Sequence, residues 1–63
     1  MKQFMCYWNP KLYSLESACR IEDELFFSEE NGYSEDDNTK IVDLSIGESI
    51  TFDDNDHIIT RVK

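Results

Sequence analysis

The sequence has few of the residues from which active sites are built. It contains one histidine, one proline, two glycines and two cysteines in 63 residues. It also lacks a G-x-S-x-G element and a glycine-rich phosphate loop, so a nucleophile, a base and an oxyanion hole have little to be assembled from. We therefore expect a non-enzymatic protein without a cofactor.

Long apolar runs and paired cysteines are missing as well. No apolar stretch approaches the roughly 18 residues of a membrane-spanning helix, and the N-terminus lacks the pattern of a secretory signal. We therefore expect a cytoplasmic protein, located in the host cytoplasm if the chain is viral. Cys6 and Cys19 have twelve residues between them, which fits neither paired zinc ligands nor a redox C-x-x-C. Two reduced thiols buried in the core are expected instead.

Basic residues are scarce as well. Six basic residues face fourteen acidic ones, giving a net charge of −8. Residues 21–60 hold thirteen acids and a single base, Lys40, for a net −12, whereas both ends of the chain are net positive. Charges that serve only solubility are usually interspersed in sign. The segregation indicates either a surface recognised for its negative charge or an acidic face that keeps a small protein soluble, and the sequence leaves both open.

The residues that are present predict a folded domain. Hydrophobic residues make up 40% of the chain and aromatic residues 13%, which is too much for a disordered segment. A chain this short buries only about 60% of its unfolded surface and cannot divide its core in two. We therefore expect residues 1–63 to form a single compact domain.

The N-terminal segment alternates in the period of a strand. Phe4, Cys6 and Trp8 fall on one side, and Met5 and Tyr7 fall on the other. Because both sides carry apolar bulk, this strand is expected to be central in its sheet.

A helix is predicted over residues 15–30. Ser14 can cap its N-terminus, apolar residues recur at helical spacing so that Leu25 and Phe26 face the core, and Asn31-Gly32 can close its C-terminus.

Two residues do not fit this helix. Glu22 falls inside the apolar arc, where Lys2 or Arg61 would be its partner if it is buried. Phe27 falls on the polar side, either as a lone exposed aromatic or as a binding anchor.

The C-terminal third predicts a β-hairpin. Residues 47–52 and 57–63 are rich in strand formers, and the polar loop 53–56 separates them. Residues 34–37 fit either a turn or the capped start of a short helix, and residues 40–44 either continue that helix or begin an extended segment. The order of elements predicts an α+β fold (β-α-β-β), with a three-stranded, mainly antiparallel sheet and one helix on one face.

The hairpin loop raises the question of a metal site. Asp53, Asp54 and Asp56 place oxygen ligands close together beside His57, but the glycine and bidentate glutamate of an EF-hand loop are absent. Turn chemistry explains these residues better, so no metal ligand is predicted and His57 is expected to be solvent-exposed. Ion binding by this group stays a third hypothesis.

The acidic segments together predict a partner-binding surface. Helix carboxylates three or four positions apart lie about 5–6 Å apart, comparable with successive phosphates, so such a surface attracts a basic groove and repels nucleic acids and anionic membranes. The predicted partner-binding residues are Asp23, Phe27, Glu29, Glu30, Tyr33, Glu35, Asp36, Asp37, Asp53, Asp54 and Asp56.

In size and charge alone, the chain resembles phage-encoded inhibitors and nucleic-acid mimics, a class that includes anti-CRISPR and anti-restriction proteins and modulators of host polymerase. The resemblance implies an acidic inhibitor that occupies a basic, nucleic-acid-binding surface of a larger partner, and it assigns no residue roles. The alternative is a small protein-binding or homodimerising domain that acts through its sheet edge or aromatic surface, with acidity only for solubility. The strength of association at different salt concentrations separates the two.

Overall fold

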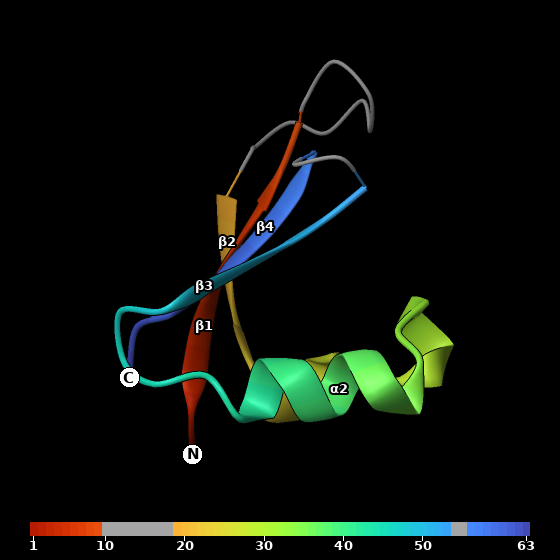
Figure 1. Cartoon of the computed structure of the whole chain (residues 1–63), viewed down its shortest axis with the longest axis horizontal. Helices are drawn as coiled ribbons and strands as arrows, with labels where there is room; N and C mark the ends of the chain where they lie inside the picture. The colour runs from red at the N-terminus through yellow and green to blue at the C-terminus, as the bar shows by residue number, and fades with distance from the viewer. Residues whose placement is uncertain (10–18, 54–55) are drawn as a thin grey trace.

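The computed structural model describes residues 1–9, 19–53 and 56–63. Within them, four strands form one antiparallel sheet in the order β2-β1-β4-β3; their bounds are Gln3–Trp8 (β1), Cys19–Asp23 (β2), Ser49–Phe52 (β3) and His57–Arg61 (β4). The α-helix α2 (Glu35–Val42) and two 3-10 helices, η1 (Glu24–Phe26) and η2 (Glu29–Asn31), lie on one side of the sheet (Figure 1). In this part of the chain no helix is long and apolar enough to cross a membrane.

The strand β1 is central, as its alternation predicts. It pairs with β2 on one side, where Cys6 is opposite Arg20, and with β4 on the other, where Cys6 is opposite Ile59. The pairing of β1 with β4 joins the two ends of the described chain, and the backbone N–H of Gln3 donates to the carbonyl of Lys63 at 3.1 Å.

The predicted three-stranded sheet is wrong, because a fourth strand lies where the helix was expected. Residues 19–23 form β2 on the outer edge of β1, and positions 15–18 of the predicted helix lie outside the described residues. The pairing places the β-branched Ile21 directly opposite Met5. Cross-strand contacts and ladder hydrogen bonds with β1 thus override a helical spacing that rested on a few apolar residues.

The rest of the predicted helix is two short turns with the opposite burial. Leu25, expected in the core, is 71% exposed, whereas Phe27, expected on the polar side, is fully buried. The side chain of Asp23 accepts from the Leu25 backbone N–H at 2.9 Å and begins η1. Gly32 does close a helix, with φ of 90°, but that helix is η2. Two separate 3-10 turns point successive side chains in directions other than those of one continuous helix. This explains why Leu25 is exposed and Phe27 is buried.

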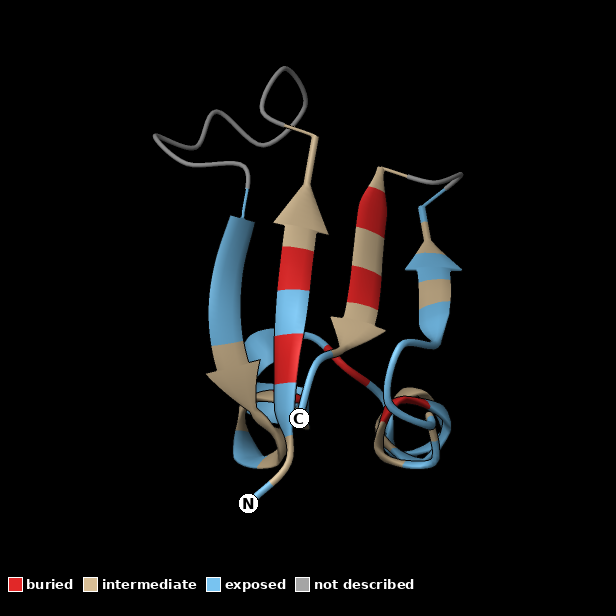
Figure 2. Cartoon of the chain, turned by 90° about the vertical axis from the view of Figure 1, so that its left-hand side faces the viewer, coloured by how far each residue is buried: buried red, intermediate tan, exposed pale blue. Residues whose placement is uncertain are grey.

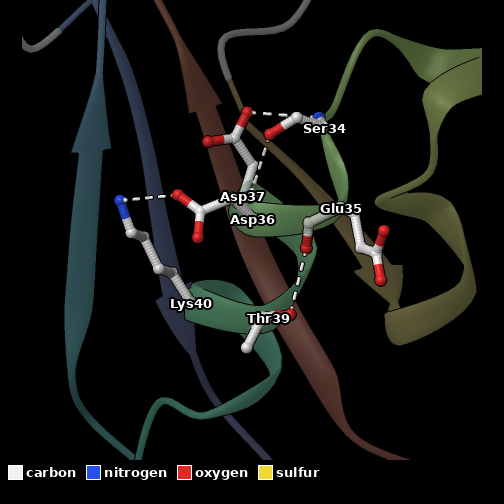
Figure 3. A network of polar contacts seen from close by, with 6 residues as sticks. All are labelled: Ser34, Glu35, Asp36, Asp37, Thr39 and Lys40. Carbon is white, nitrogen blue, oxygen red and sulfur yellow. Dashed lines mark hydrogen bonds and ion pairs between the residues drawn. The ribbon is translucent and has the colours of Figure 1, made fainter.

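The segment for which the sequence allowed either a turn or a short helix forms α2, and the N-terminus of this helix is capped. The Ser34 hydroxyl accepts from the Asp37 backbone N–H at 3.1 Å, and the Asp37 carboxylate accepts from the Ser34 backbone N–H at 3.3 Å (Figure 3). This reciprocal capping box satisfies two N–H groups that a helix start leaves without partners. Figures 1 and 2 show that α2 projects from the sheet, so that its C-terminal end lies near the strands and its N-terminal end lies farther from them.

The core lies between the sheet and this covering layer. The sheet contributes Phe4, Cys6 and Ile59, and the covering layer contributes Phe27, Tyr33 and Ile41. In Figure 2 the buried, red positions of the sheet lie on its two middle strands. The rings of Phe4 and Phe27 meet edge-to-face with centroids 5.3 Å apart, an arrangement that aromatic quadrupoles favour. The predicted β3–β4 hairpin is present and completes the sheet.

The bases expected to pair with Glu22 have another role. The Nζ of Lys2 donates to the carbonyl of Val42 at 2.6 Å, and the Nη1 of Arg61 donates to the carbonyl of Leu44 at 2.9 Å. Both cations therefore lie at the C-terminal end of α2, where the helix dipole favours positive charge. Glu22 pairs instead with Arg20, whose Nη2 is 2.7 Å from its carboxylate.

Candidate binding site at the acidic end

The expectation that His57 is exposed is wrong, because its side chain is only 4% exposed. Its Nδ1 lies 2.9 Å from the carbonyl of Tyr7, which can only accept, so Nδ1 carries a hydrogen. Its Nε2 lies 2.7 Å from the Tyr33 hydroxyl, within hydrogen-bond distance. Both ring nitrogens thus have a hydrogen-bond partner, as buried polar groups usually do.

His57 is the middle of an aromatic row across three strands. Trp8 on β1 and Phe52 on β3 are its cross-strand neighbours, and the Trp8 and His57 rings are stacked with centroids 4.7 Å apart. Tyr33 covers the row from the other layer, 5.8 Å from the His57 ring. Sequence analysis missed this cluster, although the strand alternation already placed Trp8 on the side of Phe4 and Cys6.

A half-open cavity of about 230 Å³ adjoins this aromatic row. It is lined by Trp8, Tyr33, Asp37, Phe52, Asp53 and His57, together with the turn at residues 31–32. Two acidic residues that lie far apart in the sequence therefore line one cavity: Asp37 comes from the first turn of α2, and Asp53 follows β3.

A second cavity, of about 300 Å³, brings more acids to the same region. Its lining includes Phe27, Glu29, Tyr33 and Glu35, so Tyr33 borders both cavities. Glu30 belongs to η2, and Asp36 to the first turn of α2. We call this group of six carboxylates the acidic end; it comprises Glu29, Glu30, Glu35, Asp36, Asp37 and Asp53.

The remaining predicted site residues lie elsewhere or have other contacts. Asp23 caps η1 from the end of β2, and Phe27 is buried in the core, which removes it as an exposed anchor. The Asp56 carboxylate accepts from the Asn9 side-chain amide at 2.9 Å. Asp54 lies outside the described residues. Since residues 19–23 are a strand, a helical row of carboxylates beginning at residue 22 does not form.

The two cysteines differ in environment. Cys6 is buried as expected, and burial, reinforced by the negative charge of Glu22, raises the pKa of its thiol to about 12. Cys19 is exposed, which contradicts the expectation of a second core thiol. Its place on the edge strand β2, opposite Tyr7, explains this, because that side of the sheet lies away from the core.

Comparisons of the chain with protein-family models, curated proteins and solved structures find no match. Among the described residues, no group of three or more histidine, cysteine, aspartate or glutamate side chains is arranged to hold a metal ion. The acidic end and its aromatic cavity are therefore the features from which function is argued.

Proposed function

We propose that the protein is a non-enzymatic interaction module that inhibits a larger protein by occupying its basic, nucleic-acid-binding surface with the acidic end. The observation that carries the proposal is the convergence of acids from three elements, η2, the start of α2 and the end of β3, around Tyr33. Acidity that served only solubility has no need to converge on two cavities with a shared aromatic wall.

The local charge is strongly negative despite the helix start. The N-terminus of a helix carries about half a positive charge, and the first turn of α2 sets three carboxylates against it. The one base of residues 21–60, Lys40, already pairs with Asp36 at 3.2 Å (Figure 3). A basic partner is therefore attracted over about one Debye length, roughly 8 Å at physiological salt, which speeds association.

The test compares two sets of three neutral substitutions. One set, Glu29→Gln, Glu35→Gln and Asp36→Asn, changes the acidic end. The other, Glu24→Gln, Asp43→Asn and Glu48→Gln, removes the same charge elsewhere, and glutamine at 24 and 48 can still accept the backbone hydrogen bonds of Lys2 and Ser45. Capture of partners from a lysate of the native source is measured at about 50 and about 300 mM salt.

We expect the first set to weaken capture of a nucleic-acid-binding partner by about tenfold or more and to flatten its salt dependence, because long-range attraction is lost. The second set should change capture much less. Equal effects of the two sets, or capture that does not depend on salt, would contradict recognition through the acidic end.

A second candidate, association through the sheet, is favoured by a different observation. Met5 and Ile21 lie opposite each other on the side of the sheet away from the core and are 41% and 52% exposed. This side would pair two copies of the chain by burying apolar surface. Sedimentation at increasing salt distinguishes the candidates, since a dimer held by apolar contacts persists, and Ile21→Lys should return it to a monomer.

A further inference from the structure

The aromatic cavity beside His57 has its own recognition chemistry. We infer that it seats the guanidinium group of an arginine side chain projecting from the basic partner, an inference that rests on the proposed function and names what the acidic end recognises. The observation is that one cavity of about 230 Å³ is lined by three aromatic residues, Trp8, Tyr33 and Phe52, together with two acidic residues, Asp37 and Asp53.

The size of the cavity restricts its occupant. Pockets for drug-sized ligands and cofactors occupy about 300–1,000 Å³, so this cavity suits a smaller group such as the end of one side chain. Both nitrogens of the adjoining His57 ring are already engaged, Nδ1 with the Tyr7 carbonyl and Nε2 with the Tyr33 hydroxyl. The cavity therefore combines π surface with negative charge, which selects a cation.

Guanidinium fits this combination better than ammonium. It is planar, stacks on aromatic rings, and donates two parallel hydrogen bonds to one carboxylate, whereas the lysine ammonium is a compact, strongly hydrated charge. The Asp37 carboxylate is oriented in advance, since one of its oxygens accepts from the Ser34 backbone N–H. Less side-chain freedom is then lost when the cation binds.

The protein already uses the same chemistry on the neighbouring side of the aromatic row. The guanidinium carbon of Arg20 lies 6.0 Å from the centre of the Trp8 ring and 5.7 Å from that of Phe26. Its Nη2 donates to Glu22 at 2.7 Å, which completes a site made of aromatic rings and a carboxylate. The cavity offers an arginine of another protein the same two kinds of group, aromatic rings and carboxylates.

The experiment measures binding of a capped amino acid without any partner protein. N-acetyl-arginine amide is titrated into the full chain, with the fluorescence of Trp8, the single tryptophan, as the signal. The citrulline analogue is a neutral match in shape, and the lysine analogue carries the charge without the planar fork. Free arginine is the fourth probe, which tests whether the cavity binds arginine as a metabolite instead of as a protein side chain.

Two variants locate the binding. The double change Asp37→Asn with Asp53→Asn keeps an acceptor for the Ser34 N–H and suits the left-handed backbone at position 53, where φ is 53°, since asparagine tolerates that region. The control, Asp43→Asn with Glu48→Gln, removes the same charge from two exposed residues that do not line the cavity. Circular dichroism confirms that each variant is folded.

We expect the arginine amide to bind at least about tenfold more tightly than the citrulline amide, and the Asp37/Asp53 double variant, unlike the control, to lose this preference. Equal binding of citrulline, equal or tighter binding of the lysine probe, or tighter binding of free arginine would overturn the inference. If the arginine probe fails while neutralising Glu29, Glu35 and Asp36 still weakens partner capture, the cavity assignment is wrong and the proposed function stands. If the arginine probe binds as expected but neutralising Glu29, Glu35 and Asp36 leaves partner capture unchanged, the proposed function is rejected while arginine binding by the cavity stands.

Discussion

The hydroxyl of Tyr33 and the Nε2 of His57 are 2.7 Å apart, and this hydrogen bond connects the covering layer to the central part of the sheet. Each residue depends on the other, because a buried imidazole nitrogen that loses its partner keeps the full cost of desolvation. The same two side chains line the aromatic cavity, so the stability of the fold and the shape of the candidate site are coupled.

Removal of the Tyr33 hydroxyl should therefore destabilise the protein. Tyr33→Phe keeps the ring but leaves Nε2 of His57 without its hydrogen-bond partner, at an expected cost of about 1–3 kcal/mol in the free energy of unfolding. Urea denaturation followed by circular dichroism measures it. The control is Ser49→Ala, which removes an exposed hydroxyl contact to Thr60 of the same 2.7 Å length, and should cost at most about 0.5 kcal/mol. Similar losses in both variants would contradict a buried Tyr33–His57 pair.

The predicted helix and the observed turns give opposite expectations for substitutions of Leu25 and Phe27. Phe27→Ala should cost about 3–5 kcal/mol because it empties a buried aromatic site that contacts Phe4. Leu25→Ala should be nearly neutral, since this side chain is mostly exposed. Thermal unfolding of the two variants measures the contrast, and a large loss for Leu25→Ala would restore the helix over residues 15–30.

The capping box should contribute measurably to the start of α2. Ser34→Ala removes the acceptor of the Asp37 backbone N–H, with an expected loss of about 1 kcal/mol in the free energy of unfolding. Thr39→Ala removes a hydroxyl contact to the Glu35 carbonyl in the same helix. It should have a smaller effect or none, because that carbonyl keeps access to solvent and alanine is the better helix former. Equal losses would mean that the cap is not formed in solution.

The thiols should differ sharply in reactivity. In the folded protein, one equivalent of iodoacetamide should modify Cys19 at about pH 8, while Cys6 reacts only after denaturation, since the thiolate is the reacting form. The raised pKa also sets a pH dependence. A thiol that ionises near 9.0 in the unfolded chain and near 12 when folded contributes stability below about pH 9 and loses it progressively towards pH 12. The decline in unfolding free energy between about pH 8 and about pH 10 should be smaller in Cys6→Ala.

Regular alternation and turn chemistry in the sequence identified β1 and the hairpin. Phe4, Cys6 and Trp8 share a side in both the pattern and the structure, because the side-chain period of a strand is fixed by its backbone. The β2 segment could not be recognised in the same way. CRIED has a single large apolar residue, and its pairing with β1 depends on contacts that are remote in the sequence.

The candidate site was only partly predictable for the same reason. The acids of residues 29–37 are adjacent in the chain, so their shared location follows from local structure. The approach of Asp53 to Asp37 and the burial of His57 against Trp8 and Tyr33 depend on strand register and on how the covering layer packs. Neither is a property of a short stretch of sequence.

The pairing of β1 with β4 has a consequence for the way the chain acquires its structure. The two central strands come from opposite ends of the described chain, and Phe4 is opposite Arg61. The long chain segment between β1 and β4 must therefore close into a loop before these two central strands can pair. The domain consequently has a high contact order and is expected to have a slow folding step for its size. On the ribosome, the sheet cannot form until residues 57–61 have emerged, so a nascent chain stalled before that point should remain sensitive to protease.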